Sequence, residues 1–217
     1  MVLDRHTEPS SAPIGDIIDL VKKIQEKVQY FFVDESGDPT FYNRRGKLIL
    51  GKEGVSQILI LGFIKTTDPK PIRKALLNLQ KEISEDEYLK GIPSIKKSLV
   101  AFHAKDDSPE IREKVFKTIV KLDFTAEIFV GRKIEALFKK RHHKTENEFY
   151  DDLISKLFEN KLHLNKYNEI FFAIRGSKTR QIPLKEAIEK AREKFNVDLN
   201  IYKTKVLVES GVIIPIR

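Results

Sequence analysis

Three carboxylates follow an apolar run within the sequence YFFVDESGD, residues 30–38. They belong to Asp34, Glu35 and Asp38. Such close negative charges repel one another, and solvent, a helix N-terminus or a metal ion must offset that repulsion. Gly37 permits a tight turn that brings Asp38 back toward Asp34. Oxygen ligands gathered at one point suit Mg²⁺ or Mn²⁺, so one interpretation is a metal site. The other interpretation is a solvated acidic turn in which Asp38 caps local backbone amides.

A second group of polar residues lies in FHAKDDSPE, residues 102–110. His103 and Asp107 stand just before a predicted helix, where a histidine can position or deprotonate a water and a carboxylate can orient it or bind a metal. The pattern Ser108-Pro109 is typical of a helix N-terminus. The alternative is therefore structural, with Asp107 or Ser108 as a helix cap and His103 as a half-buried packing residue.

Basic residues gather in two further stretches of the sequence. GRKIEALFKKRHHK, residues 131–144, predicts a flexible basic loop that contacts phosphates, although a plain solvated loop fits the same pattern. The adjacent His142 and His143 are not expected to share a metal ion, because neighbouring side chains rarely point at one place. The candidate nucleic-acid-binding residues are Lys133, Lys139, Lys140 and Arg141 in this stretch, and Arg175, Lys178 and Arg180 after a later predicted strand.

The composition limits the class of protein. The chain has 217 residues, a formal net charge of +8 and a sequence pI near 9.4, which favours a polyanionic partner such as nucleic acid, or simply a solubilising surface. It has no cysteine, which excludes disulfides and thiolate zinc sites. No apolar run approaches the length of a membrane span, and the N-terminus has no signal-type apolar block. A cytoplasmic protein without a membrane partner is expected.

The elements that must position these residues follow from hydrophobic periodicity. Residues 1–12 are expected to be flexible, and residues 13–28 to form an amphipathic helix packed on a single domain of residues 29–217. Strands are expected at 30–33, 47–50 and 57–65, a further extended segment at 98–102, and helices at 71–82 and 109–119. Strands at 124–130, 169–174 and 197–202 then alternate with helices at 147–162 and 184–195. This order predicts an α/β mixed sheet, three antiparallel strands followed by helix–strand units, with helices on both faces.

The three motifs YFFVDESGD, FHAKDDSPEIREKVF and FFAIRGSKTR together resemble a known family. It is the DESG-motif family of RNase H-like proteins, catalogued as a domain of unknown function, number 3800, and the similarity runs from about residue 30 to about residue 208. The resemblance implies an RNase H-like fold whose central first strand carries an acid. It also implies a metal-dependent nuclease, often in phage defence or mobile elements, with Asp34 as the first-strand acid and His103 and Asp107 in a shared motif near the site.

The sequence departs from that family near its end. Family members continue into a C-terminal helix that carries a last metal acid, whereas here only Glu209 stands near the end, so that helix is expected to be missing.

Three functions therefore stay open on the sequence, and the basic charge argues mildly against one of them, a small-molecule hydrolase or phosphatase that uses the same carboxylates. The first is a Mg²⁺- or Mn²⁺-dependent nuclease with Asp34, Glu35 and Asp38 as ligands. The second is a non-catalytic nucleic-acid-binding or assembly module derived from a nuclease, with a protein partner or a homo-oligomer.

Overall fold

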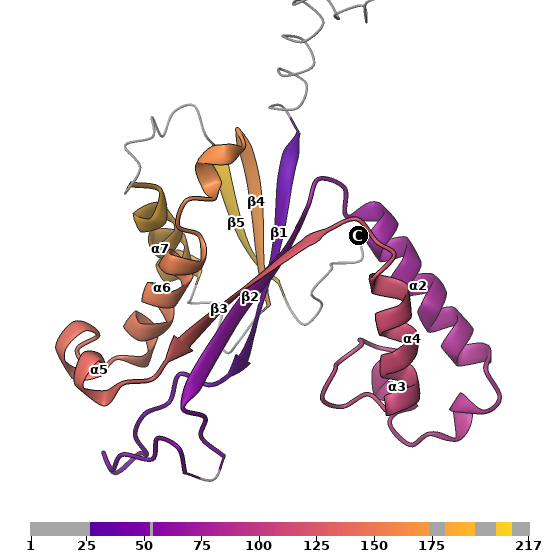
Figure 1. Cartoon of the computed structure of the whole chain (residues 1–217), viewed down its shortest axis with the longest axis horizontal. Helices are drawn as coiled ribbons and strands as arrows, with labels where there is room; N and C mark the ends of the chain where they lie inside the picture. The colour runs from indigo at the N-terminus through magenta and orange to yellow at the C-terminus, as the bar shows by residue number, and fades with distance from the viewer. Residues whose placement is uncertain (1–26, 53, 174–180, 194–202, 210–217) are drawn as a thin grey trace, which may run out of the picture.

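Five strands form one mixed sheet at the centre of the computed structural model, which describes residues 27–52, 54–173, 181–193 and 203–209 (Figure 1). Their order across the sheet is β3-β2-β1-β4-β5, with β2 antiparallel to both β1 and β3, while β4 runs parallel to β1 and β5. The expectation of an α/β mixed sheet with a central first strand is confirmed. The strands are β1 Val28–Gly37, β2 Ile58–Thr66, β3 Thr125–Arg132, β4 Tyr167–Ala173 and β5 Lys203–Glu209.

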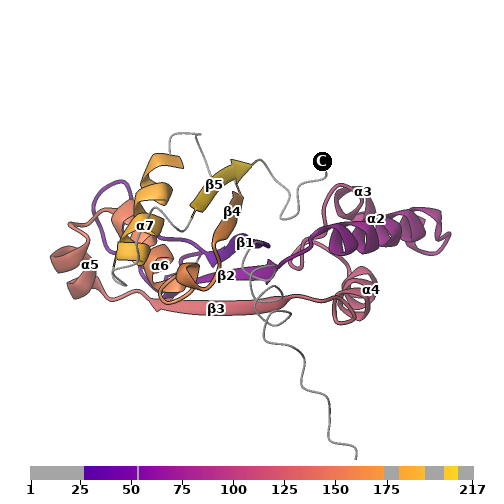
Figure 2. The same ribbon diagram turned by 90° about the horizontal axis from the view of Figure 1, so that it is seen from above.

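The two faces of the sheet differ because successive side chains of a strand point to opposite sides. In β1, Phe31 and Val33 enter the main apolar core together with Leu59, Leu61 and Phe63 of β2. Helix α6 (Glu146–Leu157) and helix α7 (Gln181–Glu193) contribute the other wall of this core, so we call this side the helix-side face. Figure 2 shows both helices on the same side of the sheet.

The opposite side, which we call the open face, carries the alternate residues. Phe32 stacks on Phe171 there with ring centroids 5.0 Å apart, and Asp34 follows Phe32 on the same face. No helix of the described part shares an apolar core cluster with this face. Helices are thus confirmed on the helix-side face only, and a helix on the open face stays a prediction.

Between β2 and β3 the chain forms a helical unit with an apolar cluster of its own. Its elements are α2 Lys70–Glu85, η1 Leu89–Gly91, α3 Ile95–Ser98 and α4 Pro109–Ile119. Leu79, Ile83, Leu89, Ile95 and Ile111 are buried together in it, separate from the main core. Figures 1 and 2 show the unit beyond the end of β2 and the start of β3. The chain therefore leaves the sheet for this unit, and returns from it, at the edge of the sheet where β1 begins.

Several predicted elements need correction. The expected strand at 47–50 is only a bridge between Tyr42 and Leu48 within a loop. The segment 98–102 follows the short helix α3 and is not a strand. The expected basic loop contains a helix, α5 Glu135–Arg141, and the helix expected to reach residue 162 ends at Leu157 before the short η2 Leu162–Leu164.

Two predicted elements fall largely outside the described residues. The predicted N-terminal helix lies there up to residue 26, and Val28, its expected last residue, opens β1. The strand expected at 197–202 also lies outside, and β5 begins at Lys203. Among the described helices, none is long and apolar enough to span a bilayer.

Candidate functional site

Asp34 lies on the open face of the central strand, near its carboxyl end. Its side chain is exposed, and it makes no hydrogen bond or ion pair within the described part of the chain. Its cross-strand neighbour is Gly62, and the next residue across, on β3, is Ile128. Gly62 carries no side chain, and a Cβ built there would lie 3.2 Å from the backbone oxygen of Glu127. No side chain therefore stands between Asp34 and Ile128, whose Cγ1 would lie 3.6 Å from that Cβ and borders the space at Gly62. The oxygens of the exposed Asp34 carboxylate are available to a ligand.

Glu35 points the other way. The alternation of β1 turns its side chain to the helix-side face, where its Oε2 accepts a hydrogen bond of 3.0 Å from the Tyr150 hydroxyl of α6. The carboxylates of Asp34 and Glu35 are adjacent in sequence, but the sheet separates them. Glu35 is therefore placed to tie β1 to α6 and does not face the same ligand as Asp34.

Asp38 is held by the loop that follows β1. Its Oδ1 accepts a hydrogen bond of 2.8 Å from the Thr40 amide and lies 3.3 Å from the Lys133 Nζ. Partial burial alone would raise the pKa of Asp38, but the Thr40 amide and the Lys133 ammonium outweigh it and lower that pKa below its ordinary value. The acidic turn is thus partly the capping turn of the alternative interpretation.

The prediction that Lys133 binds phosphates is wrong. Its side chain is fully buried, and its Nζ also donates a 3.1 Å hydrogen bond to the Thr40 carbonyl and lies 5.8 Å from the centroid of the Phe41 ring. A buried ammonium needs such partners because it has lost its water. Lys133 therefore stabilises the loop after β1, and no phosphate can reach it in this conformation.

The predicted metal ligands thus do not form one set. Asp34 faces the open side, Glu35 contacts Tyr150, and Asp38 pairs with Lys133. Across the described residues no group of three or more His, Cys, Asp or Glu side chains is arranged to hold a metal ion. Of the three, Asp34 is the carboxylate whose surroundings leave it free for a cation.

His103 and Asp107 lie in the loop between α3 and α4. Asp107 is buried, and its two oxygens accept hydrogen bonds from the Ser98 hydroxyl at 2.5 Å and from the His103 amide at 2.7 Å. The His103 ring is exposed and lies 3.8 Å from a carboxylate oxygen of Asp106. Ser108 caps α4, as its sequence pattern predicts. All these contacts stay within the helical unit, so the structure connects neither His103 nor Asp107 with Asp34.

The remaining candidate phosphate contacts divide into two groups. Lys139, Lys140 and Arg141 are exposed on α5, and Lys139 pairs with Glu135 at 2.6 Å. Arg175, Lys178 and Arg180 lie outside the described residues.

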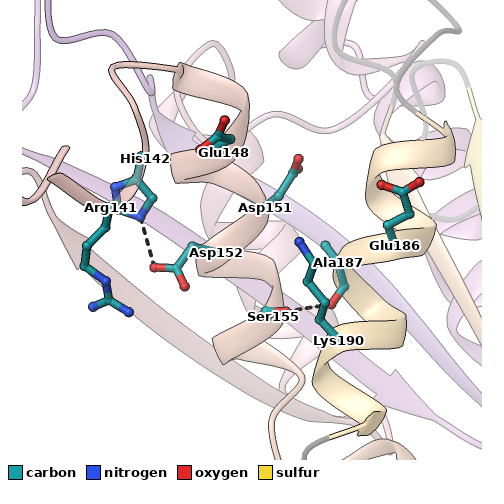
Figure 3. Close-up of a pocket in the computed structure, with 9 residues that line it drawn as sticks. All are labelled: Arg141, His142, Glu148, Asp151, Asp152, Ser155, Glu186, Ala187 and Lys190. Carbon is teal, nitrogen blue, oxygen red and sulfur yellow. Dashed lines mark hydrogen bonds and ion pairs between the residues drawn. The ribbon is translucent and has the colours of Figure 1, made fainter. Parts of the chain in front are cut away.

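A pocket of about 360 Å³ lies on the outer side of the helix layer, and no pattern in the sequence predicts it. Figure 3 shows that side chains from the end of α5, from α6 and from α7 line it. Charges of both signs surround it, so it lacks the mostly apolar lining usual for small-molecule sites. The lining residues are Arg141, His142, Glu148, Asp151, Asp152, Ser155, Glu186, Ala187 and Lys190.

The central contact of this pocket joins His142 and Asp152. The buried His142 places its Nε2 3.2 Å from Asp152 Oδ2, which also accepts a 2.9 Å hydrogen bond from Lys156 (Figure 3 shows the histidine contact). Burial would raise the pKa of Asp152, but Lys156 and His142 outweigh it and lower that pKa. The adjacent His143 contacts Glu148 instead, so the two histidines do not share a partner, as expected.

Asp152 lies opposite the apolar stripe of its helix, a position typical of a solvated face. The spacing of Asp152 and Lys156, four residues apart on α6, was a signal for their ion pair. The approach of His142 depends on how α5 turns into α6, where His143 and Lys144 both adopt positive φ. No periodicity in the sequence reveals that turn.

Comparison with known proteins adds no family assignment. No family model and no curated protein matches the sequence.

Proposed function

We propose that this protein is a divalent-metal-dependent phosphodiesterase that acts on nucleic acid, with Asp34 as its central acid. One observation carries the proposal: an exposed carboxylate without a partner in the described part of the chain stands near the carboxyl end of the central strand. The order β3-β2-β1-β4-β5 and its strand directions support the RNase H-like interpretation of the fold. That support is an analogy of fold, and the site must carry the function.

The residues fit a metal only in part. Asp34 can supply one carboxylate oxygen, and Mg²⁺ is commonly held by one or two carboxylates together with waters and substrate phosphates. Glu35 and Asp38 are engaged elsewhere, so they do not belong to the same ligand set. A cation bound at such a site polarises a phosphate and lowers the pKa of its bound water. Asp34 would position it on the open face beside Gly62, which carries no side chain.

Nucleic acid is the favoured substrate because the charge of the chain is strongly positive. Exposed Lys140 and Arg141 on α5 give part of the phosphate-binding surface in this proposal. The buried Lys133 is no longer included, for the reason given above.

Cleavage assays with RNA, single-stranded DNA and duplex DNA, each with Mg²⁺ and with Mn²⁺, test the proposal. Asp34→Asn should lose activity by more than about 100-fold, the upper end of losses seen when even an outer partner of a metal is removed. Glu35→Gln is the matched control, because it removes the same charge one residue away on the opposite face. A wild-type protein inert toward all three polymers, or equal losses in the two variants, would contradict the proposal.

The dispersal of the carboxylates favours a second candidate, a nucleic-acid-binding module without catalysis. Such a module would bind the same polymers with salt-sensitive affinity and cleave none of them. In that case Asp34→Asn should leave nucleic-acid affinity unchanged or improve it, because the substitution removes a negative charge from the surface.

A further inference from the structure

The open face carries large apolar side chains that the described elements leave exposed. On β3, Ile128 is 72% exposed and Val130 is 54% exposed, and Ile58 of β2 is 37% exposed. Ile60 pairs with Val130 across the strands. We call Ile58, Ile60, Ile128 and Val130 the open-face patch. Apolar side chains gathered in this way usually mark a surface that another segment or molecule covers.

The chain itself supplies a matching segment. Ile14, Ile17, Ile18, Val21 and Ile24 recur at the spacing of one helix face. Only residues 25–27 separate this stripe from β1, whose open face continues into that of β2 and then β3. A connection this short keeps the stripe close to the sheet at a small entropic cost.

The dimensions agree with docking on this face. A helix of residues 14–24 would be about 16 Å long. Ile128 lies in the same row across the sheet as Asp34, two strand spacings or about 10 Å to the side of β1. Asp34 itself is six residues, about 20 Å, along β1 from Val28. The stripe can therefore reach the Ile128 row if it folds back along β1.

Residues 210–217 are the competing segment of this chain, because they include the apolar run VIIPI. They follow β5, which is the opposite edge of the sheet from β3. Four strand spacings, about 19 Å, separate these two strands. Val28, where the N-terminal stripe joins the sheet, lies about 22 Å from Ile128, so the two segments start at comparable distances. The N-terminal segment is favoured because its apolar residues recur on one helix face.

We propose that residues 14–24 dock their apolar stripe on the open-face patch, centred on Ile128, within the same molecule. This proposal does not depend on the nuclease activity. It gives the exposed side chains of β3 a covering segment and makes the N-terminal segment one border of the surface that carries Asp34.

A spin label tests this directly, because the chain has no cysteine and a single Cys can be introduced cleanly. Ala126→Cys places a nitroxide on the open face beside Ile64, and Lys185→Cys places one on α7, on the other side of the sheet. In ¹⁵N-labelled full-length protein the label at position 126 should broaden the amide signals of residues 14–24 strongly, and the label at position 185 should broaden them much less. Adding Ile128→Asp should abolish the broadening.

Val120→Asp is the matched control for Ile128→Asp, because Val120 is 77% exposed on the remote helical unit and should leave the broadening intact. The proposal is overturned if the signals of residues 14–24 do not respond to the label at position 126, or if those of residues 210–217 respond in their place. It is also overturned if broadening arises only between molecules, as seen by mixing spin-labelled protein with ¹⁵N-labelled protein that carries no label, since a second copy would then cover the patch.

Discussion

Neighbouring residues of β1 have different chemical surroundings because the strand turns them to opposite faces. Asp34 lies beside Gly62 on the open face, while Glu35 accepts a hydrogen bond from the Tyr150 hydroxyl. Asp38 meets a buried ammonium three residues later. A cluster of carboxylates in sequence is therefore three separate sites in space, and each should respond differently to substitution.

The Asp38–Lys133 contact predicts a pH-dependent stability. The folded protein lowers the pKa of Asp38, so the ionised carboxylate is bound more favourably in the folded state. That contribution is present above the ordinary value of 3.8 and is lost as the pH falls through the lower folded value. Asp38→Asn should lower the free energy of unfolding by roughly 1–3 kcal/mol at pH 7, because it leaves a buried cation without its anion.

Urea unfolding at pH 7, 5 and 3 measures this difference. The gap between wild type and Asp38→Asn should be similar at pH 7 and 5 and narrower at pH 3. Thr40 and the turn are left intact by this substitution, since an Asn side chain still accepts the Thr40 amide. A gap of the same size at all three pH values would show that the ion pair is not its origin.

At this scale the sequence predicts Asp34 better than it predicts its neighbours. The apolar run 30–33 predicts a strand at this place, but β1 continues to Gly37, so Asp34 lies within the strand and not at its end. The partner of Asp38, by contrast, lies 95 residues away in the chain and comes from the end of β3. Its approach depends on how β3 pairs with β2, which no local pattern records.

Among the elements, the helical unit between β2 and β3 owes its shape partly to one carboxylate. Asp107 links the end of α3, through Ser98, to the backbone of His103. Removing a buried acceptor leaves its donors without a partner, which is more costly than losing an exposed contact.

We therefore predict opposite results for two residues of one motif. Asp107→Ala should destabilise the helical unit by about 1–3 kcal/mol, while His103→Ala, at an exposed ring, should change stability by less than about 0.5 kcal/mol. Hydrogen exchange at the amides of residues 95–119 measures this locally. Loss of stability in the histidine variant and none in the aspartate variant would contradict these assigned roles.

The sequence predicts most helices well and misplaces the strand at 47–50. The strong apolar periodicity of α2, α4 and α6 marks their positions, although their ends differ by a few residues. In the segment 43–51 the Asn43 side chain accepts hydrogen bonds from the amides of Arg45 and Lys47. Gly46 and Gly51 adopt positive φ there. Such local hydrogen bonds and turns compete with strand pairing, and a short apolar run such as 48–50 does not outweigh them.

For the whole molecule, the positive charge should dominate contact with a polyanion. Lys140 is exposed on α5. The sequence around it does not distinguish it from the other lysines, so its candidacy as a phosphate contact depends on its position in the fold. Lys140→Gln should reduce the salt dependence of nucleic-acid affinity by about one unit of slope. Lys81→Gln, at a 75% exposed lysine of α2, is the control and should leave that slope unchanged. Fluorescence titrations at several salt concentrations measure both, and equal slopes in all three proteins would exclude α5 from the binding surface.

The most direct test of the central claim is calorimetric titration of the protein with Mn²⁺. If Asp34 is the free carboxylate around which the site is built, wild type and Glu35→Gln should bind the ion, and Asp34→Asn should not. If wild type takes up no Mn²⁺, or if Asp34→Asn binds it as well as wild type does, Asp34 is not a metal ligand and the proposed nuclease chemistry has no basis.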